Sequence, residues 1–550
     1  MRTLLTSLFL TLCLHSFAQF QIDTTFNHTA YNEFTQLAGN IVNGNKLMYT
    51  PQNDLIVAGR WQTSLSQICV WKYLQDGSND LSFGGNGFGM GYVQVPVPIT
   101  YVTVTDAKVQ NDGKIVVLAD AVWSTGSFNA TQSFIALARF NSNGTPDTSF
   151  NHTGLLISSL LQNSEYETKT LDIDELGTIY IAGAVRDYGN WNCALGTGAW
   201  FIASYLPNGS LNTNFNSSGF IQTGASSIAL NFTSITPYTI PLDLKIVSNN
   251  QILLGGLFHP MDSALYFIKY NSSGTYDNSF GSNGIVNLPV NQFPMPANEL
   301  TTLYILKDNS FLLLSNNAPY LPGQPDSAVV NMLKITPAGQ VDKGFGNNGT
   351  QLLTCTANRV RFCEDKYGRL LLHWYNNLTP GTQDVYFFRY FANGQPDKTF
   401  GKNGKFGHHP IPNDTYLNGN IAQDIVMNAS NTDLSILSLR SATYAPNNTF
   451  RIINYVGDTT FKTNVEQLEP KGITLLVSPN PCAEQIQLTC SEEATYSIVA
   501  INGALIQAGI LTEGANTIYL SKEIATGTYK LLVAHKKSGT IGTASFIKTN

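Results

Sequence analysis

Short apolar runs bounded by Gly, Asn, Asp and Pro follow one another along most of this chain. β-Branched and aromatic residues fill these runs, and runs of four to eight such residues between turn-forming residues are typical of β-strands. One set reads DLIVAG, KIVVLA, TIYIAG, QILLGG, FLLLSN, RLLLHW and LSILSL, and a second set reads QICVWKY, FIALARF, WFIASYL, LYFIKYN, VVNMLKI, VYFFRYF and FRIINYV. A weaker run precedes each member of the first set and a short run follows most members of the second. The pattern therefore predicts about four strands in each unit of about 60 residues, the makeup of a propeller blade.

A fourteen-residue stretch recurs six times without gaps, at 74–87, 141–154, 206–219, 271–284, 336–349 and 391–404. Each copy has Gly at its fourth place, Asp or Asn at its seventh, Phe at its tenth and Gly at its fourteenth. Truncated copies, both reading DTTF, stand at 23–26 and 458–461. The marking residues are Phe26, Phe83, Phe150, Phe215, Phe280, Phe345, Phe400 and Phe461. These eight marks enclose seven units.

Radial stacking of the units explains the repeat best. A four-stranded sheet must bury two faces, and a closed ring of sheets buries both while leaving only short edges exposed. A β-helix has much shorter rungs, and independent sandwiches need more strands per core. We therefore predict a seven-bladed β-propeller over residues 19–464. The truncated copies at both ends suggest that the N-terminal segment completes the last blade beside residues 451–455.

The fourteen-residue stretch is interpreted as a corner. Its Gly residues adopt backbone angles closed to other residues, its Asp caps a turn, and its Phe fills the space between neighbouring blades. A rival interpretation makes the repeated Asp residues calcium ligands, but each loop offers only one or two carboxylates. These residues are Asp80, Asp147, Asp277, Asp342 and Asp397.

The pattern of a Gly, then Asp-x-Ser-Phe-Gly, then another Gly resembles a bacterial β-propeller repeat family with a period of roughly 60 residues. The resemblance covers about residues 20–462 and implies a fold, seldom a defined activity. Unit three departs from the pattern with Asn212 in place of Asp, and Gly344 stands before Phe345 where Ser or Thr is usual.

The first residues are predicted to be an export signal. Arg2 precedes an apolar run over residues 4–14, and Ser16 and Ala18 are the small residues that a signal peptidase reads. We expect cleavage after Ala18; lipidation of Cys13 is the rival reading, but Leu12 stands where a small residue is needed. No later segment approaches the ~20 apolar residues of a membrane helix. The net charge of −6, with 12% charged residues, gives no basic surface for nucleic acid.

The repeat stops near residue 465, and residues 465–472 are predicted to be a linker. Beyond it, seven short runs indicate a small Ig-like β-sandwich over residues 473–550. Its landmarks are Ser478-Pro479-Asn480-Pro481, then Asn502-Gly503, then Gly527-Thr528-Tyr529. In that order they resemble the type A C-terminal sorting domain of the type IX secretion system. The resemblance implies passage through the outer membrane by that machinery and release or attachment at the cell surface; an ordinary terminal sandwich is the alternative.

The cysteines left after the signal are Cys69, Cys193, Cys355, Cys363, Cys482 and Cys490. Cys355 and Cys363 can form a disulfide only if the chain turns between them, while a strand-like run separates Cys482 from Cys490. No zinc-like cysteine spacing, histidine ligand pair, serine-nucleophile signature or phosphate loop is present, and the adjacent His408 and His409 point to opposite faces of a strand. The sequence assigns no catalytic, cofactor-binding or metal-binding residue.

The leading functional hypothesis is a secreted or cell-surface module that binds glycan or protein with the loops of one propeller face. Aromatic residues in the longer Gly- and Asn-rich insertions would supply such contacts; they are Trp123, Tyr188, Trp191 and Tyr320. A glycan-cleaving enzyme with paired carboxylates near the axis, and a structural part of the cell surface, are the alternatives.

Overall fold

The computed structural model of the chain separates into two compact units, residues 1–458 and 459–550, each described here by itself. The residues it describes are 20–28, 31–34, 41–124, 131–160, 164–187, 199–223, 238–259, 264–289, 302–317, 328–355, 360–379, 382–408, 420–428, 430, 433–440, 449–457, 477–490, 493–500, 505–521, 524–535 and 541–549. Within these ranges the regular structure is β-strand with three short 3₁₀ turns, η1 (Phe26–His28), η2 (Phe83–Gly85) and η3 (Ser248–Asn250). The predicted signal, the linker and Phe461 lie outside the described residues.

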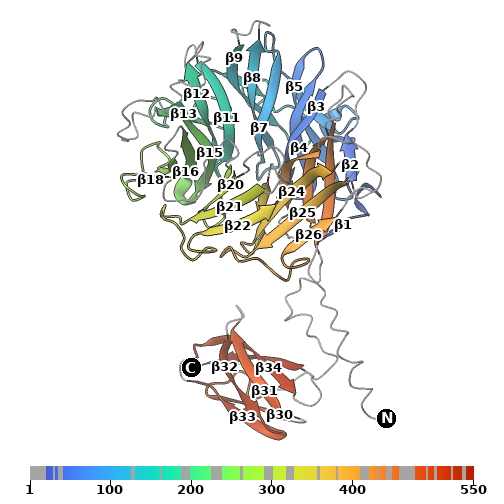
Figure 1. Cartoon of the computed structure of the whole chain (residues 1–550), viewed down its shortest axis with the longest axis vertical. Helices are drawn as coiled ribbons and strands as arrows, with labels where there is room; N and C mark the ends of the chain where they lie inside the picture. Colours follow the sequence, from blue (N-terminus) through green and yellow to red (C-terminus); the bar gives the residue numbers. More distant parts are fainter. Residues whose placement is uncertain are drawn as a thin grey trace. The chain divides into compact units, whose positions relative to one another are not determined.

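The described part of the first unit contains seven antiparallel sheets that follow one another along the chain (Figure 1). The first is β3 (Ile41–Tyr49), β4 (Leu55–Gln62), β5 (Ser66–Tyr73) and β6 (Met90–Gln94). The second is β7 (Tyr101–Val109), β8 (Ile115–Ser124), β9 (Thr131–Phe140) and β10 (Leu155–Ser158). The third is β11 (Ser164–Ile173), β12 (Ile179–Asp187), β13 (Ala199–Tyr205) and β14 (Phe220–Thr223).

The later sheets repeat the same order of strands. The fourth is β15 (Tyr238–Val247), β16 (Gln251–His259), β17 (Ala264–Tyr270) and β18 (Ile285–Pro289); the fifth is β19 (Thr302–Ile305), β20 (Phe311–Asn317), β21 (Ala328–Ile335) and β22 (Thr350–Cys355). The sixth is β23 (Arg361–Glu364), β24 (Leu370–Thr379), β25 (Thr382–Tyr390) and β26 (Lys405–His408). The last is β27 (Asn420–Met427), β28 (Asp433–Arg440) and β29 (Thr449–Gly457), joined by β1 (Phe20–Ile22) and β2 (Tyr31–Phe34).

The hydrophobic core of the first unit lies between sheets. Each of its clusters draws apolar side chains from two successive sheets and contains one repeat Phe, in sheet order Phe83, Phe150, Phe215, Phe280, Phe345 and Phe400. A further cluster joins the last sheet to the first and contains Phe26. These seven Phe side chains are at most 5% exposed. The prediction that the repeat Phe fills the space between neighbouring sheets is therefore confirmed for them.

The sheets form a ring that the N-terminal segment closes. β1 pairs with Tyr455–Gly457 and β2 pairs with Phe450–Ile453, both antiparallel on β29. The prediction that the N-terminal segment completes the last sheet beside residues 451–455 is confirmed. Because the first and the last strands of the first unit share one sheet, neither set can leave without exposing the apolar cluster around Phe26.

The repeat Asp has two structural roles. One carboxylate oxygen caps the backbone N–H two residues on, as Asp147 Oδ1 does for Ser149 at 3.0 Å. The other oxygen pairs with a cation eight residues earlier on the third strand of the same sheet; these pairs are Lys72–Asp80, Arg139–Asp147, Lys269–Asp277, Lys334–Asp342 and Arg389–Asp397. The predicted turn capping is thus confirmed for these residues.

The departures in the repeat have local explanations. Asn212 faces Ser204, so unit three replaces both members of the ion pair by neutral groups joined through a 3.1 Å hydrogen bond. Gly344 still donates its N–H to Asp342 at 3.1 Å, so only a hydroxyl contact is missing there.

The described part of the second unit forms two sheets around its own apolar core. One pairs β30 (Gln485–Cys490) with β33 (Gly514–Tyr519); the other has the order β32 (Leu505–Leu511), β31 (Ala494–Ala500), β34 (Gly527–His535), β35 (Ile541–Lys548). Asn480 holds β35 through both ends of its amide, accepting from Ile547 N–H at 2.9 Å and donating to Ser545 at 3.0 Å. Six of the seven runs predicted from sequence are strands; most of the first, residues 473–476, lies outside the described residues.

Candidate functional site

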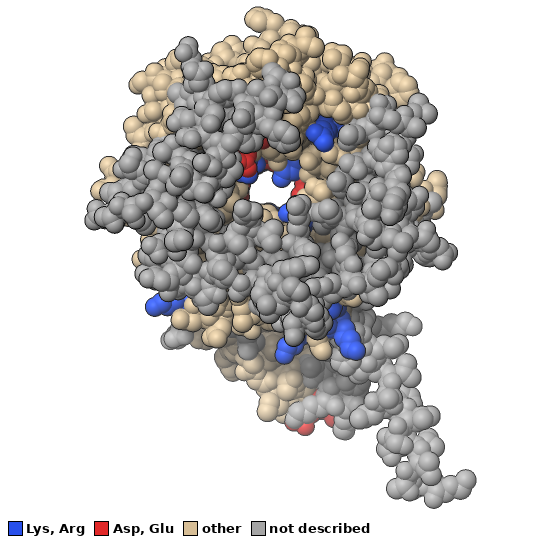
Figure 2. All heavy atoms as spheres, turned by 45° about the horizontal axis from the view of Figure 1, so that its top comes forward, with Lys and Arg blue, Asp and Glu red and all other residues tan. Residues whose placement is uncertain are grey.

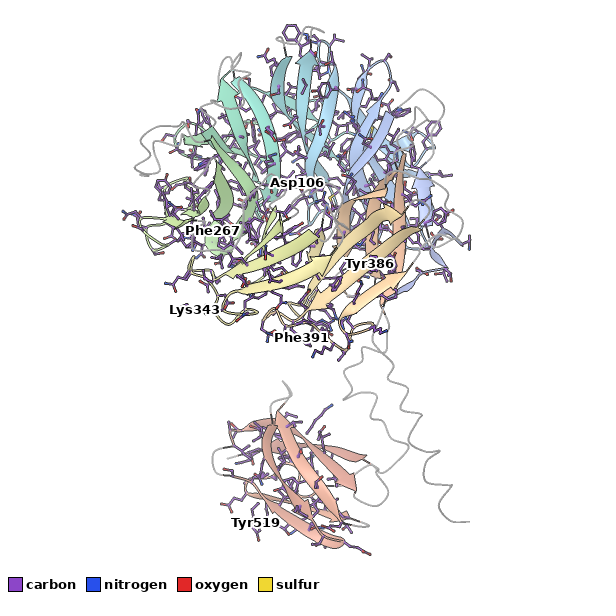
Figure 3. All side chains as sticks on the ribbon, in the orientation of Figure 1. Asp106, Phe267, Lys343, Tyr386, Phe391 and Tyr519 are labelled. Carbon is purple, nitrogen blue, oxygen red and sulfur yellow. The ribbon has the colours of Figure 1, made fainter. Side chains whose placement is uncertain are left out.

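First strands of neighbouring sheets pack beside one another, and the space-filling view shows an opening through the ring (Figure 2). β7, for example, packs beside β3 on one side and β11 on the other. Acidic and basic side chains are visible at the wall of this opening, and Asp106 lies near the middle of the ring (Figure 3). We call this surface the axial lining and define it by two alternate positions on each first strand.

Strand register identifies these two positions. In five of the seven first strands the pairing slips by one residue just before the first position, as between Val104 and Asp106. Such a bulge bends the strand and re-aims the side chains that follow it. The pairs are Lys46 and Met48, Asp106 and Lys108, Thr170 and Asp172, Asp243 and Lys245, Thr302 and Tyr304, Arg361 and Cys363, and Asp424 and Val426. The residue between each pair is apolar and at most 8% exposed.

The axial carboxylates bind the backbone of the following sheet. Asp106 Oδ2 accepts the N–H of Leu171 at 2.8 Å, and Asp424 Oδ2 accepts that of Leu47 at 2.9 Å. Asp172 and Asp243 do the same for Ile246 and Ile305, at 2.7 and 2.9 Å. In these four places a carboxylate therefore joins adjacent sheets close to the axis.

Lysines neutralise part of this acidic lining. Lys46 Nζ lies 3.1 Å from Asp106, and Lys108 Nζ lies 2.6 Å from Asp172. The charge of Asp106 raises the pKa of Lys46, against the opposing effect of burial. Burial lowers the pKa of Lys108, but Asp172, Asp106 and Asp243 together more than compensate and the net shift is upward. Both ammonium groups therefore stay charged and belong to a connected ionic network.

Asp243 is the axial carboxylate whose proton affinity is most altered. Burial raises its pKa to about 6, although the Ile305 N–H and the charge of Lys108 act in the opposite direction. Its neighbour Lys245 has a pKa lowered by burial. An acid that titrates near neutral pH in a polar channel is chemically competent for proton transfer, but its Oδ2 is already held by a backbone N–H.

Sequence reasoning anticipated carboxylates near the axis in general terms but named none of these residues. The only signal was an acidic or basic residue in the weak first strand of six of the seven units; the strand of the fifth, Thr302–Ile305, has none. That strand shows no strict alternation, because the bulge shifts its phase by one residue.

The predicted aromatic contacts are only partly described. Trp123 lies at the end of β8 and is 36% exposed, near Tyr101, which starts β7 and is 40% exposed. Tyr188, Trp191 and Tyr320 lie outside the described residues, as does His409. Cys69, Cys363, Cys482 and Cys490 are free thiols, so the conditional Cys355–Cys363 disulfide does not form.

The described residues contain no group of three or more His, Cys, Asp or Glu side chains placed to hold a metal ion. They also include no helix long and apolar enough to cross a membrane.

The family model for a domain of unknown function, the DUF5122 β-propeller, matches residues 110–150. That segment runs through β8 and β9 to the repeat Phe150, so the match identifies the repeat as a β-propeller repeat. A comparison with curated proteins found no match.

Several solved structures are distantly similar. The polysaccharide lyase Uly1 is 10% identical, with a TM-score of 0.42, and the match covers 76% of this chain and 90% of that one. A protein of unknown function from Dyadobacter fermentans is 11% identical over 64% of this chain and 94% of its own, with a TM-score of 0.35. A Trypanosoma rangeli sialidase mutant with trans-sialidase activity is 9% identical over 81% of this chain and 83% of its own, with a TM-score of 0.34. These similarities carry no information about activity.

Proposed function

We propose that this chain is an exported, seven-bladed β-propeller that binds a glycan or protein ligand outside the cell. In this proposal residues 1–18 are a signal peptide, 19–464 the propeller, 465–472 a linker and 473–550 a β-sandwich sorting domain. The type IX secretion machinery is then its export partner, and the mature protein is released or held at the cell surface.

The observation that carries the binding proposal is the position of the aromatic residues within the repeat. Trp123 is the last residue but one of β8, the second strand of its sheet. Tyr188 and Trp191 follow the second strand β12, and Tyr320 follows the second strand β20. Equivalent connections of a ring of sheets meet on one face, and aromatic side chains are what sugar and protein ligands contact most. That face is opposite the fourteen-residue corners.

The axial lining supports binding over catalysis. Four axial carboxylates each accept a hydrogen bond from a backbone N–H of the next sheet through one oxygen. They are Asp106, Asp172, Asp243 and Asp424. These contacts form a structural network that holds the ring rigid, as a binding scaffold requires. A glycan-cleaving enzyme and a structural cell-surface component remain the alternatives.

The binding proposal is tested with the purified full chain on glycan and protein arrays. A ligand found there should bind at least about ten-fold more weakly to Trp123→Ala, because an aromatic anchor commonly contributes 2 kcal/mol or more. Tyr367→Ala is the matched control, since Tyr367 is 58% exposed in a first-to-second-strand turn on the opposite face. Equal loss in both variants would contradict the proposed face. Product formation during incubation would favour the enzyme instead.

The export proposal is tested separately. Residues 473–550 fused to a periplasmic reporter should bring it to the surface or medium of a bacterium with the type IX route. A fusion that stays periplasmic would reject the sorting assignment without touching the binding proposal.

A further inference from the structure

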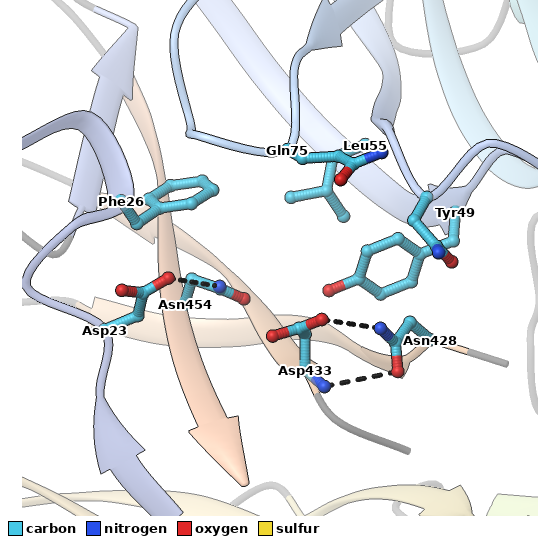
Figure 4. Close-up of a pocket in the computed structure, with 9 residues that line it drawn as sticks. Asp23, Phe26, Tyr49, Leu55, Gln75, Asn428, Asp433 and Asn454 are labelled. Carbon is cyan, nitrogen blue, oxygen red and sulfur yellow. Dashed lines mark hydrogen bonds between the residues drawn. The ribbon is translucent and has the colours of Figure 1, made fainter. Parts of the chain in front are cut away.

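A pocket of about 320 Å³ lies at the seam where the last sheet of the ring meets the first (Figure 4). We call it the seam pocket. The residues that line it include Asp23, Phe26, Tyr49, Leu55, Asp433 and Asn454. The N-terminal segment, the first sheet and the last sheet each contribute to it, so the pocket exists only in the closed ring.

In the first sheet, a lysine occupies the position that Asn454 occupies in the last sheet. Lys72 Nζ lies 3.0 Å from Asp54 Oδ2 and 3.2 Å from Asp80 Oδ2. Two carboxylates from different turns thus hold one ammonium group between them. This arrangement shows what the corner of a sheet in this repeat is built to bind.

Strand register makes the two places equivalent. Leu55 pairs with Tyr73 in the first sheet, and Leu434 pairs with Tyr455 in the last. The residues directly before these four are Asp54, Lys72, Asp433 and Asn454. Asp80 and Asp23 correspond because each is three residues before a repeat Phe. The last sheet therefore keeps both carboxylates, as Asp433 and Asp23, and has Asn454 where the first sheet has the lysine.

The other sheets show that this combination is unusual within the ring. A Lys or Arg occupies the cation position in the second, fourth, fifth and sixth sheets and pairs with the repeat Asp in each. In the third sheet the cation and the Asp are both replaced by neutral residues, Ser204 and Asn212. Only the last of the seven described corners keeps its repeat Asp and lacks Lys or Arg at the cation position.

We propose that the seam pocket binds a primary ammonium group on an alkyl chain, in the place that Lys72 occupies in the first sheet. Asn454 is shorter than lysine, and it is one of the residues that line the pocket. Asp23 and Asp433 flank the pocket, while Phe26 and Leu55 give it apolar walls for methylene groups (Figure 4). Free diamines and lysine side chains of peptides carry this chemistry alike.

Both carboxylates accept hydrogen bonds from neutral donors. Asp23 accepts from Asn454 Nδ2 at 3.1 Å and from the N–H of Thr25 at 3.0 Å. Asp433 accepts from Asn428 Nδ2 at 2.6 Å. The phenol of Tyr49 lies in the same negatively charged surroundings. Burial raises the pKa of Tyr49, and the charges of Asp433 and Asp23 raise it further.

The test is isothermal titration calorimetry of the full chain with 1,5-diaminopentane, with Nα-acetyl-lysine amide and with neutral 1-pentanol. Both amines should bind and the alcohol should not. If only the diamine binds, the pocket takes free polyamines. If both amines bind, it also accepts the lysine side chain of a peptide. Binding of neither amine, or equal binding of 1-pentanol, overturns the proposal.

Two variants locate the binding. Asn454→Lys should fill the pocket from within, so it should raise the melting temperature of the free protein and weaken amine binding at least about ten-fold. Asp433→Asn should weaken binding to a similar extent. Asp112→Asn, in the corresponding turn of the second sheet, is the matched control and should bind as the parent does. Unchanged binding in Asn454→Lys, or a lower melting temperature of that variant, overturns the proposal. The seam-pocket proposal is independent of the proposed aromatic binding face, because no residue of that face lines the pocket.

Discussion

Asn454 donates its Nδ2 hydrogen to Asp23 Oδ2 at 3.1 Å, although the two residues are 431 positions apart in the sequence. In five other sheets the corresponding contact is an ion pair between residues eight positions apart. The last sheet makes the contact between the N-terminal segment and the last strand of the first unit. The N-terminal segment therefore performs the same structural role as an internal repeat corner.

This role predicts that Phe26 is as important to the fold as an internal repeat Phe. Phe26→Ala and Phe150→Ala should each lower the free energy of unfolding by ~3–5 kcal/mol, since both side chains are fully buried in clusters between sheets. Urea unfolding followed by circular dichroism measures this. Phe88→Ala is the control, because Phe88 is 69% exposed and its loss should cost less than ~0.5 kcal/mol. A Phe26 variant as stable as the control would mean that the N-terminal segment is dispensable.

The corner ion pair is predicted to be strongly coupled. Arg389 and Asp397 are both about 5% exposed or less at their side chains and lie 2.7 Å apart. Arg389→Ser or Asp397→Asn alone should cost ~3–5 kcal/mol, because each removes one member of a buried ion pair and keeps the other charge. The double variant reproduces the Ser204–Asn212 pair of unit three and should cost clearly less than the two singles together. Additive losses in a double-mutant cycle would show that the pair is not coupled.

Asp243 should make the stability of the ring depend on pH. Its folded pKa of about 6 lies above the ~4 of an unfolded Asp, so the folded state binds the proton more tightly. The contribution of Asp243 to stability is therefore greatest at acid pH and falls as pH rises through 6. Asp243→Asn keeps an acceptor for Ile305 and should show a flatter dependence between pH 4.5 and 7.5 in urea titrations. Identical slopes for variant and parent would place the titration elsewhere.

Asn480 is predicted to stabilise the second unit alone. Removing its amide in Asn480→Ala deletes two hydrogen bonds to β35 and should cost ~1–2 kcal/mol in that unit. The expected result in calorimetry is a lower transition for the second unit and an unchanged transition for the ring. Glu513→Ala, in an exposed turn of the same unit, should leave both transitions in place. A shift of the ring transition would contradict the division into two units.

Local sequence was sufficient for the corners and the ring closure. The Gly, Asp and Phe of the fourteen-residue stretch act within a few residues of one another, so their spacing reports their geometry directly. The two truncated copies indicated ring closure. The repeat array begins and ends with an incomplete copy, so its two ends together can complete one unit. Asp147 illustrates this: its capping of Ser149 depends on nothing outside the stretch.

Only the tertiary structure showed what lies at the axis and at the seam. Asp106 contacts Leu171, and Asp23 contacts Asn454, through pairings between sheets that no sequence period encodes. Lys72 and Asn454 occupy equivalent positions in the first and last sheets. Strand register shows that two carboxylates lie near each of these positions. By itself the sequence determined the repeating unit and its turns, because these depend on neighbours in the chain; the polar sites depend on which sheets the closed ring brings side by side.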